Sequence, residues 1–206
     1  MKVIVLSLNT AFERRKYMAK ILSEQNINFE FYDSLSPKDL DKSLLHNSTY
    51  YLSNEAIATF ETHRSVLNQI KDDSDFTIIL EDDATPIKSE IICKIENLLE
   101  TELDWDIIFL GWIAKSPDKK IVNQNFLKVN KFIGLHSYIV NPKNVNKVLS
   151  QLGESTDHID KRISILGHSN KLNLLFLSSK LFNQNTKLKS QIPKKNNYDK
   201  NISNRI

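Results

Sequence analysis

Three consecutive carboxylates, Glu81-Asp82-Asp83, are the residues of this chain whose types and spacing best suit chemistry. They directly follow the apolar, β-prone run 76–80, which is typical of a buried parallel strand. In open α/β sheets, ligands bind outside the carboxyl ends of the strands. Carboxylates crowded there repel one another unless a cation neutralises them. In extended backbone Glu81 and Asp83 point to the same side, so we expect this pair to hold Mg²⁺ or Mn²⁺.

Two other interpretations of the acidic run are a solvated turn that caps the next helix and the acidic pair of a response-regulator receiver domain. In a receiver domain the acids follow the first strand, and a phosphorylatable Asp lies at a later strand end. Here the strand ends that follow carry Gly111 and Asn141 instead, so the receiver interpretation is set aside.

Basic residues lie close to the end of the first predicted strand, 3–6. Arg14 and Arg15 fall in the first turns of the helix that follows, where cations oppose the helix dipole. This placement favours contact of one of them with an anion such as a diphosphate, although a solvent-facing position explains it equally well. Asp33 follows the second strand, 27–32, where an acid often meets a ribose hydroxyl. A glycine-rich phosphate loop is absent, and the whole chain has only four Gly.

Polar side chains also interrupt apolar patterns further along the chain. His63 faces inward on a helix that begins after Ser53, which suits either a core hydrogen bond or a role beside the diphosphate or the acidic loop. His136 and Tyr138 share one face of the strand 134–140. Asp157 and Asp160 are three residues apart and can share a helix face, although Asp157 is also a plausible helix N-cap.

Strand and helix patterns alternate along most of the sequence. Further strands are expected at 105–111, ending in a tight turn at Gly111, and at 174–177. The segments 34–52 and 112–130 are predicted to be irregular. This order predicts an α/β fold with a Rossmann-like, mostly parallel sheet and helices on both faces.

Composition limits the class of protein. The 206 residues carry a net charge of +3, which gives no argument for a nucleic-acid partner. The lone Cys93 excludes a disulfide framework and a thiolate zinc site. Neither a signal peptide nor a membrane span is evident, so we expect a cytoplasmic protein.

The end of the chain differs in character from the rest. We expect a single transferase domain over residues 1–185 and a loose, basic tail over residues 186–206. The tail is either solvated or attracted to an anionic membrane surface, such as the cytoplasmic face of the inner membrane.

Taken in order, these motifs resemble glycosyltransferase family 25, which includes lipopolysaccharide and lipooligosaccharide enzymes and collagen-modifying relatives. The resemblance covers nearly the whole chain and depends on the order and spacing of its motifs. They lie at residues 5–8, 14–15, 29–33, 52–53, 57–58, 62–63, 79–83, 105–106, 110–111, 134–138, 157–158 and 184–190. One position departs from the family pattern: Glu55-Ala56 stands where the family usually has Gly-Glu, and the following Gly and Cys are Ala58 and Thr59 here.

The resemblance implies a GT-A-type fold and an inverting, metal-dependent transfer of a hexose, galactose or glucose, from a UDP-sugar to a lipooligosaccharide or other glycan acceptor. It assigns the metal to Glu81 and Asp83, with Mn²⁺ or Mg²⁺ as cofactor. Seven residues are expected to bind the donor: Ser7, Leu8, Arg15, His63, Asp82, His136 and Tyr138. Asp157 is expected to be the catalytic base, with Asp160 as the second choice.

Two other functions remain open on the sequence. One is a catalytically inactive family member that serves as a binding or scaffold subunit. The other is a metal-dependent nucleotidyltransferase, which also uses an acidic loop on an α/β sheet. The second would normally need a Gly-rich or Lys-bearing phosphate loop near the first strand, and residues 7–10 offer neither.

Overall fold

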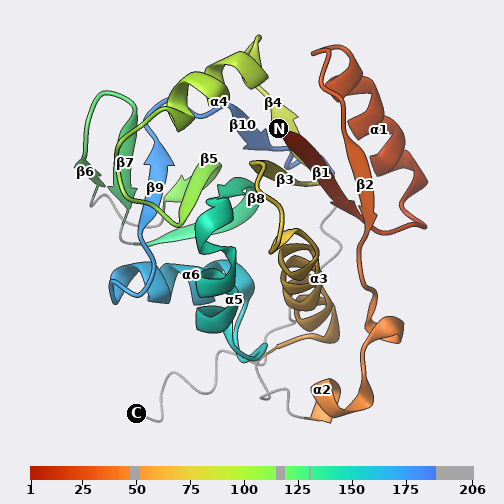
Figure 1. Cartoon of the computed structure of the whole chain (residues 1–206). Coiled ribbons are helices and arrows are strands. Elements are labelled where there is room, and N and C mark those ends of the chain that lie inside the picture. The colour runs from red at the N-terminus through yellow and green to blue at the C-terminus, as the bar shows by residue number, and fades with distance from the viewer. Residues whose placement is uncertain (47–51, 115–118, 130, 189–206) are drawn as a thin grey trace.

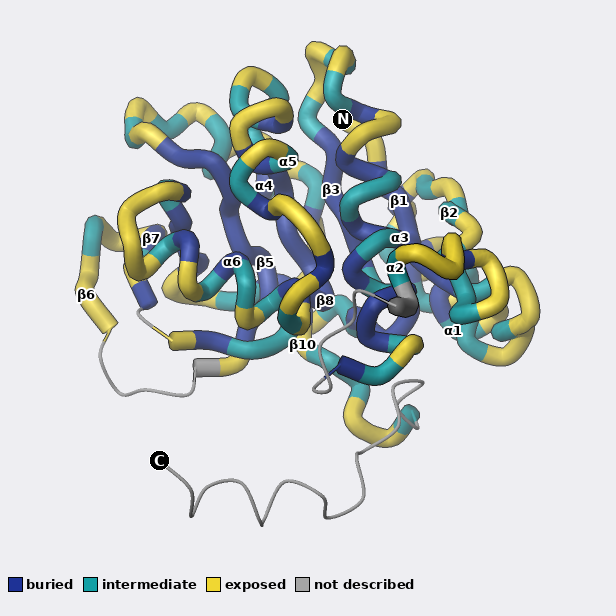
Figure 2. Tube along the Cα trace, turned by 90° about the horizontal axis from the view of Figure 1, so that it is seen from below, coloured by how far each residue is buried: buried dark blue, intermediate teal, exposed yellow. Residues whose placement is uncertain are grey.

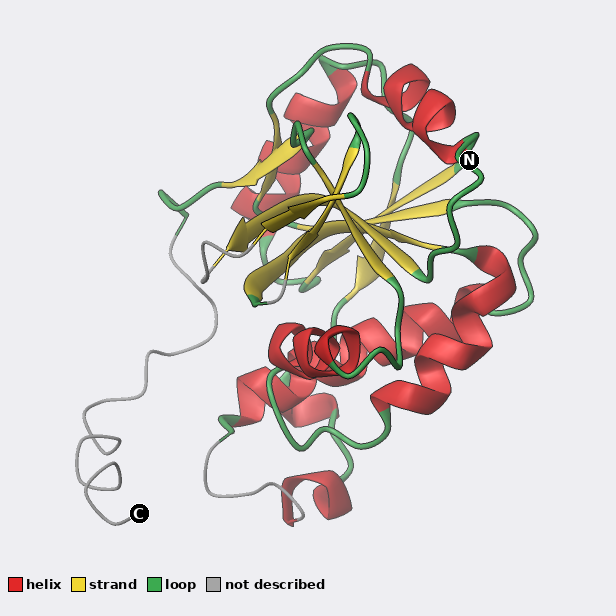
Figure 3. Cartoon of the chain, turned by 90° about the vertical axis from the view of Figure 1, so that its left-hand side faces the viewer, coloured by secondary structure: helices red, strands yellow, loops and turns green. Residues whose placement is uncertain are grey.

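A central sheet separates two groups of helices (Figures 1 and 3). The computed structural model describes residues 1–46, 52–114, 119–129 and 131–188. Its sheet has eight strands in the order β2-β1-β3-β8-β5-β9-β7-β6. The strands are β1 (Lys2–Ser7), β2 (Glu30–Asp33), β3 (Thr77–Glu81), β5 (Ile107–Ala114), β6 (Lys119–Ile121), β7 (Phe126–Val129), β8 (Phe132–Val140) and β9 (Leu174–Leu177).

Most strands of the sheet run in one direction, which confirms the predicted fold class. β1 is parallel to both β2 and β3, and β5 is parallel to β9. The central strand β8 is antiparallel to both of its neighbours, β3 and β5. Because β8 is reversed, the start of this strand lies near the carboxyl ends of β3 and β5.

Helices cover both faces of the sheet. On one face, buried residues of α1 (Phe12–Ser23) and α4 (Ile91–Leu99) share one hydrophobic core with Val3 and Val5 of β1. On the other face, buried residues of α3 (Asn54–Ile70), α5 (Val145–Leu152) and α6 (Ile159–His168) share a second core with Ile4 and Leu6 of the same strand. The alternation along β1 therefore builds two cores, and the buried strands between them are dark blue in Figure 2.

The long helix α3 begins where the sequence predicts. The hydroxyl of Ser53 accepts a hydrogen bond from the backbone N–H of Ala56 at 3.2 Å, as a helix N-cap does. The buried residues of the helix include Phe60, His63 and Leu67, so the inward position of His63 is confirmed. The cap and the apolar stripe together fix His63 against the sheet.

The segment 112–130 is more regular than predicted. β5 continues through Gly111 to Ala114, so the expected tight turn at Gly111 is wrong. β6 and β7 then form an antiparallel pair. A second small sheet pairs β4 (Ala84–Pro86) with β10 (Phe182–Gln184). This pairing holds the end of the described chain against the acidic loop.

The connection between β2 and α3, predicted to be irregular, contains only short helical turns among its described residues. It contains the 3₁₀ turn η1 (Pro37–Asp39) and the short helix α2 (Lys42–His46). A similar turn, η2 (Pro142–Asn144), precedes α5. Residues 47–51 and all but the first three residues of the predicted tail, 186–206, lie outside the described residues.

Of the helices that the structure describes, none has the length and apolar character needed to cross a bilayer.

Candidate functional site

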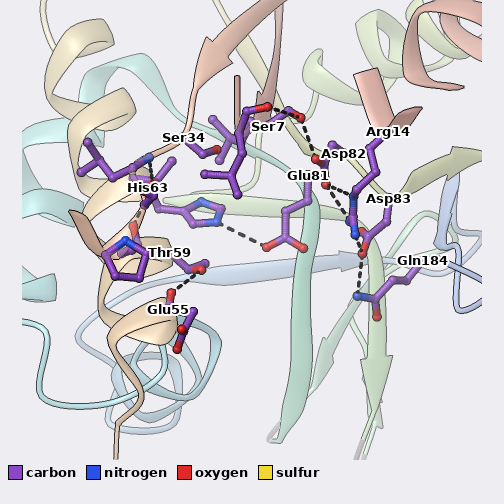
Figure 4. A pocket seen from close by; sticks show the side chains of 17 residues that line it. Ser7, Arg14, Ser34, Glu55, Thr59, His63, Glu81, Asp82, Asp83 and Gln184 are labelled. Atoms are coloured by element: carbon purple, nitrogen blue, oxygen red, sulfur yellow. Dashed lines mark hydrogen bonds and ion pairs between the residues drawn. The ribbon is translucent and has the colours of Figure 1, made fainter. Parts of the chain in front are cut away.

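A cleft lies where the strands β1 and β3 end, and the three acids of the sequence prediction lie in its wall (Figure 4). The loop after β1, the connection after β2, the first half of α3 and the acidic loop surround it. Its lining comprises Leu6, Ser7, Leu8, Arg14, Ser34, Leu35, Ser36, Pro37, Glu55, Ala58, Thr59, Thr62, His63, Glu81, Asp82, Asp83 and Gln184. The cleft therefore occupies the place where α/β sheets bind ligands.

Asp82 is a structural member of the acidic loop. Its Oδ2 accepts a hydrogen bond from the Ser7 hydroxyl at 2.6 Å, and its Oδ1 pairs with Arg14 at 2.6 Å. Burial raises the pKa of Asp82, and the contacts with Ser7 and Arg14 lower it in part. Asp82 thus ties the acidic loop to the end of β1 and to the first turn of α1.

Asp83 has one engaged and one free carboxylate oxygen. Its Oδ2 pairs with Arg14 at 3.1 Å and accepts a hydrogen bond from Gln184 at 3.3 Å. Its Oδ1 is buried and has no hydrogen-bond partner among the described residues. Burial and the neighbouring Glu81 raise the pKa of Asp83 from 3.8 to about 6. The site therefore holds more negative charge than Arg14 neutralises.

Glu81 points away from the other two acids and toward His63, as Figure 4 shows. Its Oε1 lies 3.4 Å from His63 Nε2, and His63 Nδ1 lies 2.8 Å from the Tyr138 hydroxyl. Burial is the largest influence and acts to raise the pKa of Glu81, but the His63 contact and the charges of His136 and Arg14 together leave this pKa lowered. About a quarter of the Glu81 side chain is exposed, compared with 12% of Asp83. Glu81 is therefore a charged carboxylate that a ligand can reach.

Arg15 stabilises the loop after β1. It donates to the carbonyl oxygens of Leu8 at 3.1 Å and Ser7 at 2.8 Å, and it pairs with Asp33. Its guanidinium also lies over the Phe31 ring, 4.7 Å from the ring centroid. Ser7 and Leu8 line the cleft as expected, whereas Arg15 is not among the lining residues. Arg15 shapes this wall from behind, and Arg14 is the cation that faces the cleft.

His136 and Tyr138 require a correction, because neither lines the cleft. Each is 1% exposed. Tyr138 lies behind His63, and burial raises the pKa of its hydroxyl well above the usual range. Burial likewise lowers the pKa of His136, which keeps its ring neutral. The β-pattern correctly places both residues on β8, but it does not reveal that α3 and β10 cover this part of the strand.

The two aspartates expected to act as the base lie in different surroundings. Asp160 lines a second cavity, which Ala56, Thr59, Glu81, Gly134, Leu135, His158, Ile159 and Gln184 complete. Asp157 lines neither cavity and pairs with Lys161 at 2.7 Å. The expected N-cap at Asp157 is also wrong: the N-cap of α6 is His158, and the Asp157 carboxylate accepts the backbone N–H of this next residue at 3.0 Å.

Sequence reasoning missed several residues of the cleft wall. Gln184 reaches the site because β10 pairs with β4, a contact about 100 residues apart in sequence. Glu55, Ala58 and Thr59 reach it because α3 turns this face of its first two turns toward the acidic loop. The sequence did indicate a role for Arg14, since the unfavourable position of Arg14 and Arg15 near a helix N-terminus predicted that one of them contacts an anion.

The donor set suits a divalent cation that shares its coordination with a ligand. No group of three or more His, Cys, Asp or Glu side chains within the described ranges converges as a metal site. Mg²⁺, however, commonly takes one or two carboxylates and completes its shell with water and substrate phosphates. The unpartnered Oδ1 of Asp83, buried in a site with excess negative charge, meets that requirement.

Comparisons of the sequence with known proteins identify its family. The model of "Glycosyltransferase family 25 (LPS biosynthesis protein)" matches residues 1–163. The chain is 26% identical over 199 residues to lipooligosaccharide biosynthesis protein lic2B of Haemophilus influenzae, covering 88% of this chain and 71% of that protein. It is 22% identical over 169 residues to human procollagen galactosyltransferase 2, and this match covers 72% of the chain but only 27% of the human protein.

Solved structures share the fold at low sequence identity. Mouse xyloside xylosyltransferase 1 in its apo form has a TM-score of 0.50 and 13% identity, and the match covers 84% of this chain and 70% of that one. A197 from STIV has a TM-score of 0.51 and 12% identity, with 88% and 83% of the two chains covered. The fold is of the GT-A type, and with the family model matching most of its length, the chain belongs to glycosyltransferase family 25.

Proposed function

We propose that this glycosyltransferase moves a hexose, galactose or glucose, from a UDP-sugar to a lipooligosaccharide-type acceptor, with inversion and with help from a divalent metal. The names of two relatives support the choice of sugar and acceptor: one is a galactosyltransferase and the other a lipooligosaccharide biosynthesis protein. The observation that carries the proposal is the Asp83 carboxylate, with its unpartnered buried oxygen in the cleft at the carboxyl ends of the strands.

The nucleotide sugar would bind along the end of β1, where Ser7 and Leu8 form one wall and Ser34 to Pro37 form the other. Asp83 would hold Mn²⁺ or Mg²⁺ through Oδ1. The metal, when bound, supplies positive charge to the departing diphosphate. Arg14 lies beside the same carboxylate and adds a fixed positive charge to this part of the cleft. Asp82 would act indirectly, by holding Arg14 and Ser7 in place.

Inversion requires an acceptor hydroxyl on the side of the sugar opposite to the diphosphate, and a group that takes its proton. Glu81 and Asp160 both line the second cavity. The carboxylate oxygens of Asp160 accept backbone N–H groups, from Gly134 at 3.0 Å and from Lys161 at 2.7 Å. We therefore assign proton acceptance to a Glu81 carboxylate oxygen, with His63 and Tyr138 positioning it from behind.

The experiment that tests this function is donor turnover by the Asp83→Ala variant. Wild type is expected to bind UDP-galactose or UDP-glucose more tightly with Mn²⁺ and to hydrolyse it slowly without an acceptor. Asp83→Ala is expected to lose roughly 10²–10³-fold in this turnover, as removal of a group that stabilises developing charge does. Asp72→Ala, an exposed aspartate ahead of β3, is the matched control and should behave as wild type.

The products separate the rival functions. A transferase releases UDP, whereas a nucleotidyltransferase exchanges pyrophosphate into a nucleoside triphosphate. If wild type and Asp83→Ala bind donor and Mn²⁺ equally weakly and neither turns over, the scaffold function replaces the one proposed here.

A further inference from the structure

The second cavity adjoins the cleft, and residues of β8 and α6 line it in addition to elements that the two hollows share. It lies between the first turns of α3, the start of β8 and the start of α6. Thr59, Glu81 and Gln184 line both hollows. The two hollows therefore share a wall, and Glu81 is the carboxylate in that wall.

The lining of this cavity combines two kinds of surface. Ala56, Leu135 and Ile159 are buried apolar residues. Thr59, His158, Asp160 and Gln184 bring hydroxyl, imidazole, carboxylate and amide groups that can bind hydroxyls. A pyranose ring has a matching division, with C–H groups on its faces and hydroxyls around its rim. Among these lining residues His158 is the one basic side chain. A diphosphate, which needs more positive charge, is therefore an unsuitable occupant.

One hydrogen bond and one backbone turn define the shape of this wall. The Asp160 carboxylate accepts the backbone N–H of Gly134, which ties the start of α6 to the start of β8. Gly134 has a φ of 83°, so the chain turns there in a way that L side chains rarely adopt. The hydrogen bond thus fixes the start of α6, which carries His158 and Asp160, relative to β8.

We propose that this cavity is the acceptor subsite and holds one pyranose ring of the acceptor, with the reacting hydroxyl beside Glu81. The inference rests on the proposed function, because it needs a donor sugar in the neighbouring cleft. It assigns the acceptor to α3, β8 and α6, and the donor to β1, β2 and α3. It also makes α3 a divider, because Ala56 lines only the second cavity and Ala58 lines only the cleft.

That division gives a matched pair of variants on one helix. Ala56 and Ala58 are each 2% exposed, and Ala→Leu adds the same bulk at both. Ala56→Leu is expected to raise the KM for the acceptor about tenfold or more, with the donor Kd changed less than about twofold. Ala58→Leu is expected to do the opposite, since its added side chain enters the donor cleft. Melting curves confirm that both variants fold.

A second pair avoids the core. His158 is exposed and lines the cavity, whereas His168 is exposed at the far end of the same helix. His158→Ala should weaken use of the acceptor about three- to tenfold, and His168→Ala should not change it. The probe acceptors are methyl β-galactoside, methyl β-glucoside and methyl β-lactoside, with UDP release as the readout and titration calorimetry for the donor.

The outcomes distinguish the two proposals. If wild type neither binds nor hydrolyses a UDP-hexose, the proposed function fails. If it hydrolyses donor but no methyl glycoside accelerates UDP release, the function stands and the pyranose subsite is overturned. The subsite is also overturned if Ala56→Leu and His158→Ala leave the acceptor KM unchanged, or if Ala56→Leu weakens the donor as much as the acceptor.

Discussion

The buried position of Asp83 lowers the stability of the folded protein when its carboxyl is ionised. Burial and Glu81 raise the pKa of its carboxyl to about 6, so ionising it is harder in the folded protein than in the unfolded chain. The protonated carboxyl therefore contributes its full share to the free energy of unfolding below about pH 4, and this contribution is lost as the pH rises through about 6. At neutral pH the metal-free protein carries a charge that its fold does not fully compensate.

Asp83→Asn should therefore stabilise the metal-free protein above pH 6. An amide cannot ionise, and it keeps an oxygen acceptor for Arg14 and Gln184. The expected gain at pH 7.5 is about 1–3 kcal/mol, or roughly 2–8 °C in Tm, and it should vanish at pH 4. Thermal melts across this pH range measure it. Mn²⁺ should raise the Tm of wild type only, and a variant that is less stable than wild type at pH 7.5 would contradict the prediction.

The three acids illustrate what sequence can give at this scale. Their position at a strand end follows from the apolar run before them. Their separate partners do not, because these come from three distant parts of the chain: Ser7 with Arg14, then His63, then Gln184. Glu81 and Asp83 were expected to point to one side as in a strand, but the strand ends at Glu81 and the backbone turns before β4 begins at Ala84.

At the scale of the element, β5 depends on the missing side chain of Gly111. A Cβ there would clash with His136 Nε2 and lie 2.5 Å from the Phe182 carbonyl oxygen and 2.6 Å from the Ser137 hydroxyl. Gly111 therefore allows β8 and β10 to approach β5 closely. The same contact holds β10, and with it Gln184, beside the acidic loop.

Gly111→Ala should destabilise the protein by about 2–4 kcal/mol, because a backbone oxygen cannot move aside as a flexible side chain can. Gly153→Ala provides the comparison. Its nearest new contact is Arg162 at 3.7 Å, so its cost of about 1–2 kcal/mol arises from its φ of 64° alone. Urea unfolding of both variants measures the difference. Equal losses would show that close packing at β5 does not matter.

Elements with a clear period were predictable, and those defined by pairing were not. Helix α3 shows a cap and an apolar stripe in its own sequence, and β1 and β3 are apolar runs. The strands β4, β6 and β10 have three residues each, too short to show any alternation. Their structure comes from partners elsewhere in the chain, as does the reversal of β8.

At the scale of the whole molecule, charge is concentrated at one end of the chain. Residues 187–206 contain six basic residues, namely Lys187, Lys189, Lys194, Lys195, Lys200 and Arg205, against one acid, Asp199. Basic residues near an anionic bilayer contribute roughly 1 kcal/mol each. If the proposed acceptor is lipid-linked, such an attraction would bring the enzyme to the membrane surface that carries it.

The full chain should therefore co-sediment with vesicles that contain about one-third phosphatidylglycerol at low salt, and release from them at about 0.5 M NaCl as charges are screened. A chain that ends at Leu188 should remain in the supernatant and should still bind UDP-hexose, since the cleft residues all precede this position. Equal sedimentation of the two chains would place the membrane contact elsewhere.

The reversed central strand also has a consequence for synthesis on the ribosome. Until Phe132–Val140 emerges, β3 is an edge of the β2-β1-β3 group with unpaired backbone N–H and C=O groups, and β5 has no β8 to join. A single late segment must bridge both halves of the sheet at once. Nascent chains that stall before β8 is made can collapse, but their unpaired strand edges favour aggregation with other chains.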